Sequence, residues 1–178
     1  MKKILVFALS LVLVFGALTG CGQSANSSSA NVDLQAFHAS LFEKYPEYFT
    51  ASVDATEYAE MFEAAYPGLS AIETKQLLVY QPMMSFVVCE LALVEVANAA
   101  DVQTVKDIFQ KRIDDQVAGG AFYPESVAGW TNNAHVVSNG NYVMLIAWNA
   151  SDGQYDENDN LITLGYDNEV VEMFNDLF

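Results

Sequence analysis

Residues 134–148, AHVVSNGNYVMLIAW, limit the fold of this chain more than any other stretch. Asn139-Gly140 separates two apolar, β-prone runs, and these two residue types best tolerate the positive φ angles of a type I′ hairpin turn. The predicted register pairs residues across a two-residue loop: Ser138 with Asn141, Val137 with Tyr142, and His135 with Met144. Residues 142–148 are apolar almost throughout, so we expect an internal strand that is covered on both faces.

Other segments supply the elements that such a sheet needs. Apolar residues at helical spacing predict helices over 33–44, 57–66, 101–117 and 168–178, with Asn98 and Asp167 as N-caps of the last two. Apolar β-prone runs predict strands over 77–80 and 86–96. The order is ααββαββα. We therefore expect an α+β fold, a small, mostly antiparallel sheet of about four strands with helices packed on it.

The first twenty residues have the layout of a secretory signal peptide. Met1-Lys2-Lys3 is basic, residues 4–17 are apolar, and small residues precede Cys21. The apolar run is shorter than the roughly 20 residues of a membrane-spanning helix. Leu18-Thr19-Gly20-Cys21 resembles a bacterial lipobox, in which diacylglycerol is attached to the cysteine, which becomes the first residue of the mature protein. An ordinary signal peptide that happens to contain a cysteine is the alternative.

These features predict three parts: a signal peptide at 1–20, a Ser/Asn-rich tether at 21–32 and a single α+β domain at 33–178. We expect the protein to lie on the extracytoplasmic side of the cell membrane, where diacylglycerol on Cys21 anchors it. Cys89 is the only other cysteine, so no intramolecular disulfide can form if Cys21 is acylated. The apolar neighbours of Cys89 indicate a buried side chain rather than a catalytic thiol.

The predicted mature chain is strongly acidic. Loss of Lys2 and Lys3 leaves five Lys and Arg against 23 Asp and Glu, a formal charge of −18. Such a surface repels nucleic acid, so we expect no nucleic-acid partner. Solubility in an anionic envelope accounts for this charge, and a cationic partner or a divalent metal is the alternative.

Several short motifs resemble a family of small lipoproteins from Gram-positive, largely clostridial bacteria, known as domain of unknown function 4358. They are Tyr66-Pro67-Gly68, Pro82-Met83-Met84-Ser85 before a strand with Glu90, the helical VKDIFQKR, and GNYV before a final helix. The resemblance implies no activity and no catalytic residues, because the family has none assigned. The acidic segment 151–167 departs from the family, in which a shorter link is expected.

That acidic segment is the best local candidate for a metal site. Its oxygen-bearing residues fall at positions 1, 3, 5 and 12 of a calcium-loop spacing: Asp156, Asn158, Asn160 and Asp167. Leu161 stands where such a loop requires Gly, and Asp167 stands where it requires Glu. We therefore favour a hairpin or solvated loop, with an extra strand over 161–164, and expect no metal and no cofactor.

Other charged residues are also more simply explained by structure. Glu90 and Glu95 fall on opposite faces of one strand, and we expect at least one of them to be exposed at a strand end. His135 is a lone histidine at a sheet margin. Three cations gather in one helix, where neighbouring aspartates can pair with them: Lys106, Lys111 and Arg112.

Six aromatic residues lie near Pro or Gly, in segments expected to be loops: Tyr45, Tyr48, Phe49, Phe122, Tyr123 and Trp130. They can pin loops to the core, which we favour, or stack on a sugar or a partner side chain. No catalytic motif occurs. We expect a non-catalytic binding module of the cell envelope, with a protein or glycan partner. The alternatives are an envelope hydrolase without a recognisable motif and a calcium-binding surface protein.

Overall fold

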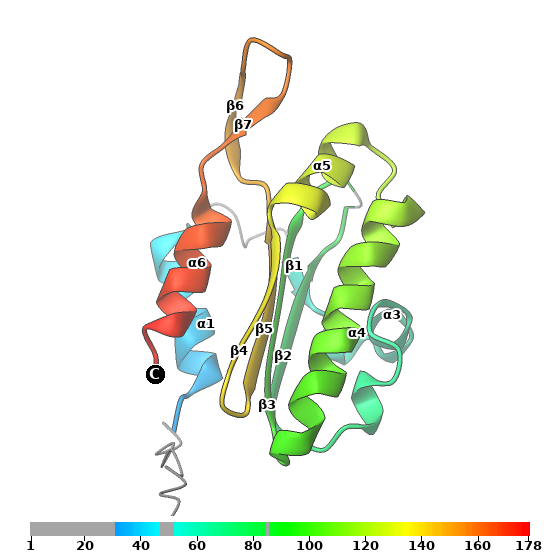
Figure 1. Cartoon of the computed structure of the whole chain (residues 1–178), viewed down its shortest axis with the longest axis vertical. Coiled ribbons are helices and arrows are strands. Elements are labelled where there is room, and N and C mark those ends of the chain that lie inside the picture. The colour runs from blue at the N-terminus through cyan, green and yellow to red at the C-terminus, as the bar shows by residue number, and fades with distance from the viewer. Residues whose placement is uncertain (1–30, 47–51, 85) are drawn as a thin grey trace, which may run out of the picture.

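The computed structural model describes residues 31–46, 52–84 and 86–178, which form an α+β fold in three layers (Figure 1). A five-stranded antiparallel sheet is the middle layer, in the order β1-β2-β3-β5-β4. Its strands are β1 Ser52–Asp54, β2 Thr74–Pro82, β3 Cys89–Val96, β4 Ala134–Asn139 and β5 Tyr142–Trp148. The α+β class and the antiparallel sheet are confirmed. The expected count of about four strands and the expected order ααββαββα are both wrong, because β1 adds a short edge strand and residues 124–132 add a helix before β4.

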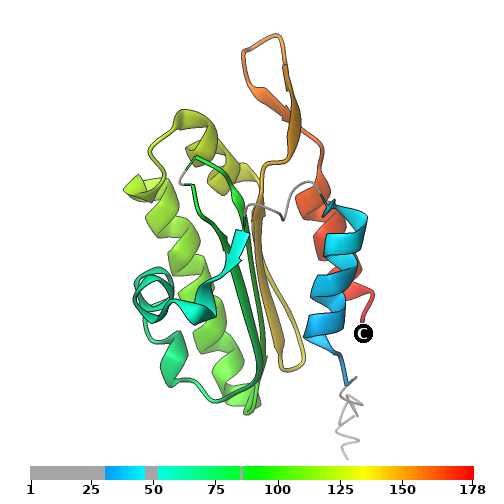
Figure 2. The same cartoon turned by 180° about the vertical axis from the view of Figure 1, so that it is seen from behind.

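Helices cover both faces of the sheet (Figures 1 and 2). α1 Leu34–Lys44 and α6 Tyr166–Asn175 pack on one face, and α3 Ala59–Ala65, α4 Val102–Asp115 and α5 Pro124–Asn132 lie on the other. Short turns complete the chain: η1 Ala55–Glu57, η2 Leu69–Ala71, η3 Ala99–Asp101 and the π-turn η4 Gln116–Gly120. All residues of β3 and β5 are buried, so these two strands form the centre of both apolar cores.

The amphipathic helices were predictable from their spacing. α1 begins after Asp33, whose carboxylate accepts a hydrogen bond from the Ala36 N–H. α4 buries Val105, Phe109 and Ile113 against the sheet, as the stripe of apolar residues predicted. Asn98 does cap a helical segment, but the segment is the 3₁₀ turn η3 that precedes α4.

The predicted hairpin forms, but its register differs from the prediction. Asn139 pairs with Tyr142, and Val137 pairs with Met144. The two loop residues are therefore Gly140-Asn141, one position later than predicted. Gly140 has φ 53°, and Asp159 is the one described non-glycine residue with positive φ, so Asn141 does not share the left-handed conformation. This φ pattern is that of a type II′ turn, which places Gly first.

Two further predictions about helices are wrong. Residues 124–132 form α5, although Pro124 and Gly129 made this segment resemble a loop. Pro124 occupies the first helical position, where its missing N–H costs no hydrogen bond. α6 begins at Tyr166 after Gly165 as N-cap, so Asp167 lies in the first turn and is not the N-cap.

The acidic segment forms a two-stranded ribbon of β6 Ser151–Tyr155 and β7 Leu161–Thr163, which confirms the expected hairpin with an extra strand. The ribbon extends beyond the main sheet, at the end where α5 lies (Figure 1). α1 begins at the opposite end of the longest axis, so the chain enters the domain far from this ribbon.

Candidate functional site

A buried ion pair between α4 and β3 organises a polar cluster inside the domain. Arg112 follows the apolar stripe of α4, so its side chain turns toward the sheet, where β3 begins with Cys89 and Glu90. Its Nε and Nη2 atoms donate to the two carboxylate oxygens of Glu90, at 2.9 and 2.7 Å. Only 1% of the Glu90 side chain and 17% of that of Arg112 are exposed. The paired geometry gives two charge-assisted hydrogen bonds in a region largely shielded from water.

Other side chains complete this cluster. The Tyr66 hydroxyl and the Gln81 amide also donate to Glu90. The Trp130 ring lies 5.3 Å from the Arg112 guanidinium carbon, within cation–π range. Burial would lower the pKa of Arg112, but the hydrogen bonds to Glu90 raise it above its ordinary value. Burial and the Glu90 charge raise the pKa of Tyr66 well above its usual range. Near neutral pH, Arg112 therefore stays positively charged and the Tyr66 hydroxyl stays protonated.

An open cleft of about 350 Å³ lies over this ion pair. Glu90, Arg112, Gln81 and Gln116 provide its polar surface. Its apolar walls include Met61, Met83, Met84, Val87 and Trp130. Methionine side chains are flexible and polarisable, so such walls adapt to apolar groups of different shape.

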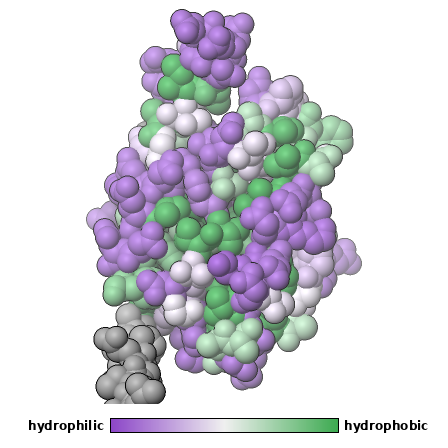
Figure 3. Space-filling model, in the orientation of Figure 1, coloured by the Kyte–Doolittle hydropathy of each residue, from purple (hydrophilic) through white to green (hydrophobic). Residues whose placement is uncertain are grey.

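Met83 and Met84 line this cleft, Phe86 follows them in the chain, and Phe122 and Tyr123 directly precede α5. All five side chains are exposed, and we call them the apolar rim. Phe122 is 84% exposed and Met83 is 67% exposed. The Phe86 and Tyr123 rings meet edge to face at 6.2 Å, and Ser126 Oγ donates to the Phe86 carbonyl at 3.0 Å. Hydrophobic surface lies over α5 at this end of the molecule and also across the middle of the same face (Figure 3). Large apolar side chains exposed close together are typical of a contact surface.

The charge around the rim is negative. Four of the five Lys and Arg residues in the described chain are already paired: Lys44 with Glu169, Lys75 with Glu95, Lys111 with Asp115, and Arg112 with Glu90. Glu125 lies beside Phe86 and Tyr123 in a hollow of the rim. The rim therefore combines apolar groups with one bordering carboxylate, that of Glu125.

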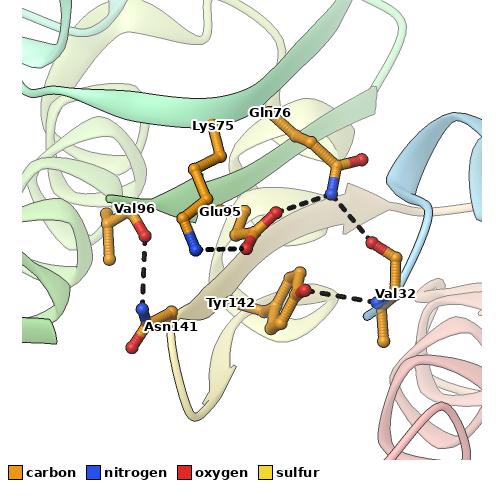
Figure 4. A network of polar contacts seen from close by, with 7 residues as sticks. All are labelled: Val32, Lys75, Gln76, Glu95, Val96, Asn141 and Tyr142. Atoms are coloured by element: carbon orange, nitrogen blue, oxygen red, sulfur yellow. Dashed lines mark hydrogen bonds and ion pairs between the residues drawn. The ribbon is translucent and has the colours of Figure 1, made fainter. Parts of the chain in front are cut away.

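Glu90 and Glu95 do lie on opposite faces of β3, as predicted, but the expectation that one is exposed is wrong. Glu95 accepts hydrogen bonds from Gln76 at 2.7 Å and from Lys75 at 3.2 Å (Figure 4). Gln76 also donates to the Val32 carbonyl, and the Tyr142 hydroxyl accepts from the Val32 N–H (Figure 4). This network fixes the start of the domain to the sheet and leaves the glutamate unavailable for a second site.

His135 does lie at the sheet margin on β4, but it has a partner that the sequence did not reveal. Its Nε2 lies 2.7 Å from Oδ2 of Asp167, a fully buried residue in the first turn of α6. Asn168 Nδ2 donates to the same oxygen at 3.1 Å. The pair joins α6 to the edge strand, which is a structural role.

The four candidate calcium ligands do not come together in one shell. Asp156 accepts from the backbone N–H groups of Asn158 and Asn160 and from the Asn160 amide, all within the ribbon turn. Asp167 instead contacts His135. In the described residues no group of three or more His, Cys, Asp and Glu side chains could hold a metal ion.

The remaining candidates separate into buried and exposed groups. Tyr45 packs against Trp148 and Tyr166, and Trp130 is buried in α5, so these two aromatics pin their segments to the core. Phe122 and Tyr123 are exposed in the rim. Cys89 is buried. Cys21, Tyr48 and Phe49 lie outside the described residues.

Sequence reasoning missed the ion pair and the rim. It paired Arg112 with neighbouring aspartates, but only Lys111 makes such a pair, with Asp115 at 2.6 Å. The signal that could have revealed the rim is Met83-Met84 followed by Phe86, an apolar run beside Pro82 that a strand alone does not require.

Comparison with known proteins agrees with the resemblance seen in the sequence. The pattern that defines a domain of unknown function, DUF4358, matches residues 51–147, which include the whole lining of the cleft over Arg112 and the whole apolar rim. Searches of curated proteins and of solved structures found no match. No helix among the described residues is long and apolar enough to cross a membrane. Because the match covers more than half of the chain, the protein belongs to the DUF4358 family of domains of unknown function.

Proposed function

We propose that this protein is a lipoprotein of the cell envelope, anchored through diacylglycerol on Cys21, whose domain binds a polypeptide partner at the cleft and the apolar rim. The signal-peptide layout of residues 1–20, the lipobox-like Leu18-Thr19-Gly20-Cys21 and the polar tether support the anchor. The resemblance to lipoproteins of Gram-positive bacteria supports a location at the cell surface.

The single observation that carries the binding function is the exposure of five large apolar side chains beside a cleft. Exposed aromatic and methionine side chains are typical of the centres of protein–protein interfaces. The cleft offers adaptable apolar walls into which one side chain of a partner can insert.

Charge defines the partner further. The rim lies on a domain whose cations are mostly neutralised by ion pairs, and Glu125 borders the rim directly. A partner segment that combines Lys or Arg with apolar side chains complements this surface, whereas an anionic lipid bilayer is repelled by it. The rim also lies at the α5 end of the molecule, opposite the start of α1, so it faces away from an anchor on the N-terminal tether (Figure 1).

Binding is better supported than hydrolysis. Glu90 and Arg112 converge in the cleft, which a hydrolytic site would also require, but they are bonded to each other. The pKa values of Arg112 and Tyr66 are raised away from neutrality. A general acid or base needs a pKa near the working pH.

A peptide-binding experiment with the purified full-length chain tests this function. The probe is a short labelled peptide that alternates Lys with Leu and Trp, and its charge-reversed twin carries Glu in place of Lys. We expect saturable binding of the basic peptide in fluorescence anisotropy. The triple variant Phe86→Ser/Phe122→Ser/Tyr123→Ser should weaken it more than about tenfold, because truncated interface aromatics often cost over 1 kcal/mol each.

The matched control removes exposed apolar side chains elsewhere: Tyr58→Ser/Tyr155→Ser/Ile162→Ser. It should leave the affinity unchanged. Equal loss in both variants would show unspecific attraction to an acidic protein and would overturn the assignment of the rim. Equal binding of the acidic peptide, or saturable binding to anionic phosphatidylglycerol vesicles that the rim variant weakens, would also overturn it.

A further inference from the structure

A second cleft, of about 270 Å³, lies between α5 and the β6–β7 ribbon, apart from the ion pair and the methionine walls. Its polar surface is made of four side-chain amides, one hydroxyl and two carboxylates: Asn132, Asn133, Asn149, Asn160, Thr163, Glu125 and Asp159. No Lys, Arg or His lines it. Such a surface can donate and accept hydrogen bonds in equal measure, but it has no cation to hold an anionic ligand.

Asn133 and Asn149 retain hydrogen-bonding capacity, whereas the Asn160 amide already donates to Asp156. The buried Asn133 donates to Thr163 Oγ1 at 3.5 Å, and Asn149 donates to the Glu125 carbonyl at the same distance. Both contacts are at the outer limit for a hydrogen bond, so these N–H groups gain from a closer partner. A polar group that is shielded from water without a good partner costs free energy, which a ligand with matching groups would recover.

Gly129 allows α5 to pack closely enough against Asn149 for the amides of both segments to line one cleft. A Cβ at this position would lie 2.9 Å from Cβ and Nδ2 of Asn149. α5 can therefore approach the segment after β5 only because residue 129 has no side chain. The close approach brings Asn149 to the same cleft as Asn132 and Asn133 from the helix end.

We propose that this cleft binds a neutral carbohydrate. A sugar presents neighbouring hydroxyls that each donate and accept, which matches the paired capacity of amide side chains. Pro124, Ala128 and Leu161 add an apolar surface on which the C–H face of a sugar ring can rest. The volume is slightly below the roughly 300–1,000 Å³ of pockets for drug-sized ligands, which suits a sugar unit at the end or side of a glycan.

The carbohydrate site is distinct from the polypeptide site, although Glu125 borders both. Asn149, Asn160 and Thr163 lie after the residues that match the DUF4358 pattern, whereas the whole lining of the cleft over Arg112 lies within them. The rim variant described above should therefore leave sugar binding unchanged. Loss of peptide binding and loss of sugar binding can be separated in one set of proteins.

Saturation-transfer difference NMR with the full-length chain, held in a detergent without a sugar head group, tests the site. The probes are glucose, galactose, N-acetylglucosamine and its β-1,4-linked tetramer, with triglycine as a non-sugar control of similar polarity. We expect a saturable signal from at least one sugar and a weaker one from triglycine. The variant Asn133→Ala/Asn149→Ala should weaken sugar binding about tenfold, since each lost hydrogen bond is worth a few-fold in affinity.

A matched control removes two exposed amides from α4, Gln103→Ala/Gln110→Ala, and should bind like the unaltered chain. If the double asparagine variant does not fold by circular dichroism, Asn132→Arg is used, because this exposed residue places a long side chain at the cleft. That variant should also weaken binding about tenfold. Absence of saturable binding for every sugar, equal binding of triglycine, or binding that the cleft variants leave unchanged would overturn the proposal.

Discussion

Replacement of Arg112 by methionine should destabilise the domain strongly, although it removes a residue that water partly reaches. Glu90 accepts four hydrogen bonds, and Arg112 provides two of them together with a neutralising positive charge. Arg112→Met leaves a carboxylate that is 1% exposed with only Tyr66 and Gln81. Loss of one partner of a buried ion pair typically costs about 3–5 kcal/mol, a large share of the roughly 5–15 kcal/mol of a domain's stability.

Urea denaturation followed by tryptophan fluorescence measures this loss. With a slope of about 2 kcal/mol per molar urea, the midpoint should fall by about 2 M. Two buried tryptophans report on the transition, and Trp130 lies directly against the guanidinium.

The adjacent residue supplies a matched control. Lys111 pairs with Asp115 at 2.6 Å, but both side chains are more than half exposed, so Lys111→Met should cost less than about 1 kcal/mol. The double variant Arg112→Met/Glu90→Leu removes both charges and should recover most of the stability. The reasoning is refuted if Arg112→Met costs no more than Lys111→Met, or if the double variant is no more stable than the single one.

Burial raises the pKa of the Cys89 thiol to about 12. The thiol should therefore resist alkylation by iodoacetamide in the native domain and react only on unfolding, as measured by intact mass. Rapid labelling of the native domain would contradict this prediction. Asp167 is fully buried and His135 is partly exposed, so His135→Ala leaves a buried carboxylate without its partner. In thermal unfolding, His135→Ala should cost about 3 kcal/mol and Asp167→Ala about 1 kcal/mol. An equal cost of the two variants would argue against a buried carboxylate. Burial alone would raise the pKa of Glu95, but hydrogen bonds, first that from Gln76, hold it below its usual value. The stabilisation that the Glu95 carboxylate provides is therefore complete above the ordinary carboxyl pKa of about 4.3 and is lost as the pH falls through the lower pKa of the folded state. The unfolding free energies of the unaltered chain and of Glu95→Gln should therefore differ less in acid. A difference that stays constant between about pH 7 and about pH 3 would refute this prediction.

Much of the fold could be predicted from the sequence, because the apolar residues of its core elements follow strong helical or strand patterns. β5 is a continuous apolar run, and α4 carries three buried residues at helical spacing, so both were predicted in type and approximate position. The hairpin register was not predictable from local preference. Asn139-Gly140 and Gly140-Asn141 are both acceptable turns, and the structure adopts the second.

Much less of the site could be predicted, because it depends on contacts between residues that lie far apart in the sequence. Arg112 and Glu90 are 22 positions apart, and neighbouring aspartates offered a simpler local explanation. α5 was missed because Gly129 weakens a helical pattern, and the reason for the glycine is its contact with Asn149. Such requirements arise only when the elements are packed together.

The proposed attachment of lipid to Cys21 would decide where this domain works, and the mass of the mature N-terminal peptide tests it most directly. The chain is expressed in a Gram-positive host, extracted from membranes and digested, and the N-terminal peptide is identified by mass spectrometry. We predict a peptide that begins at Cys21 and carries diacylglycerol, and we predict that Cys21→Ser abolishes both the modification and the membrane retention. A mature chain that begins elsewhere, or an unmodified Cys21 thiol, would contradict the proposed anchor.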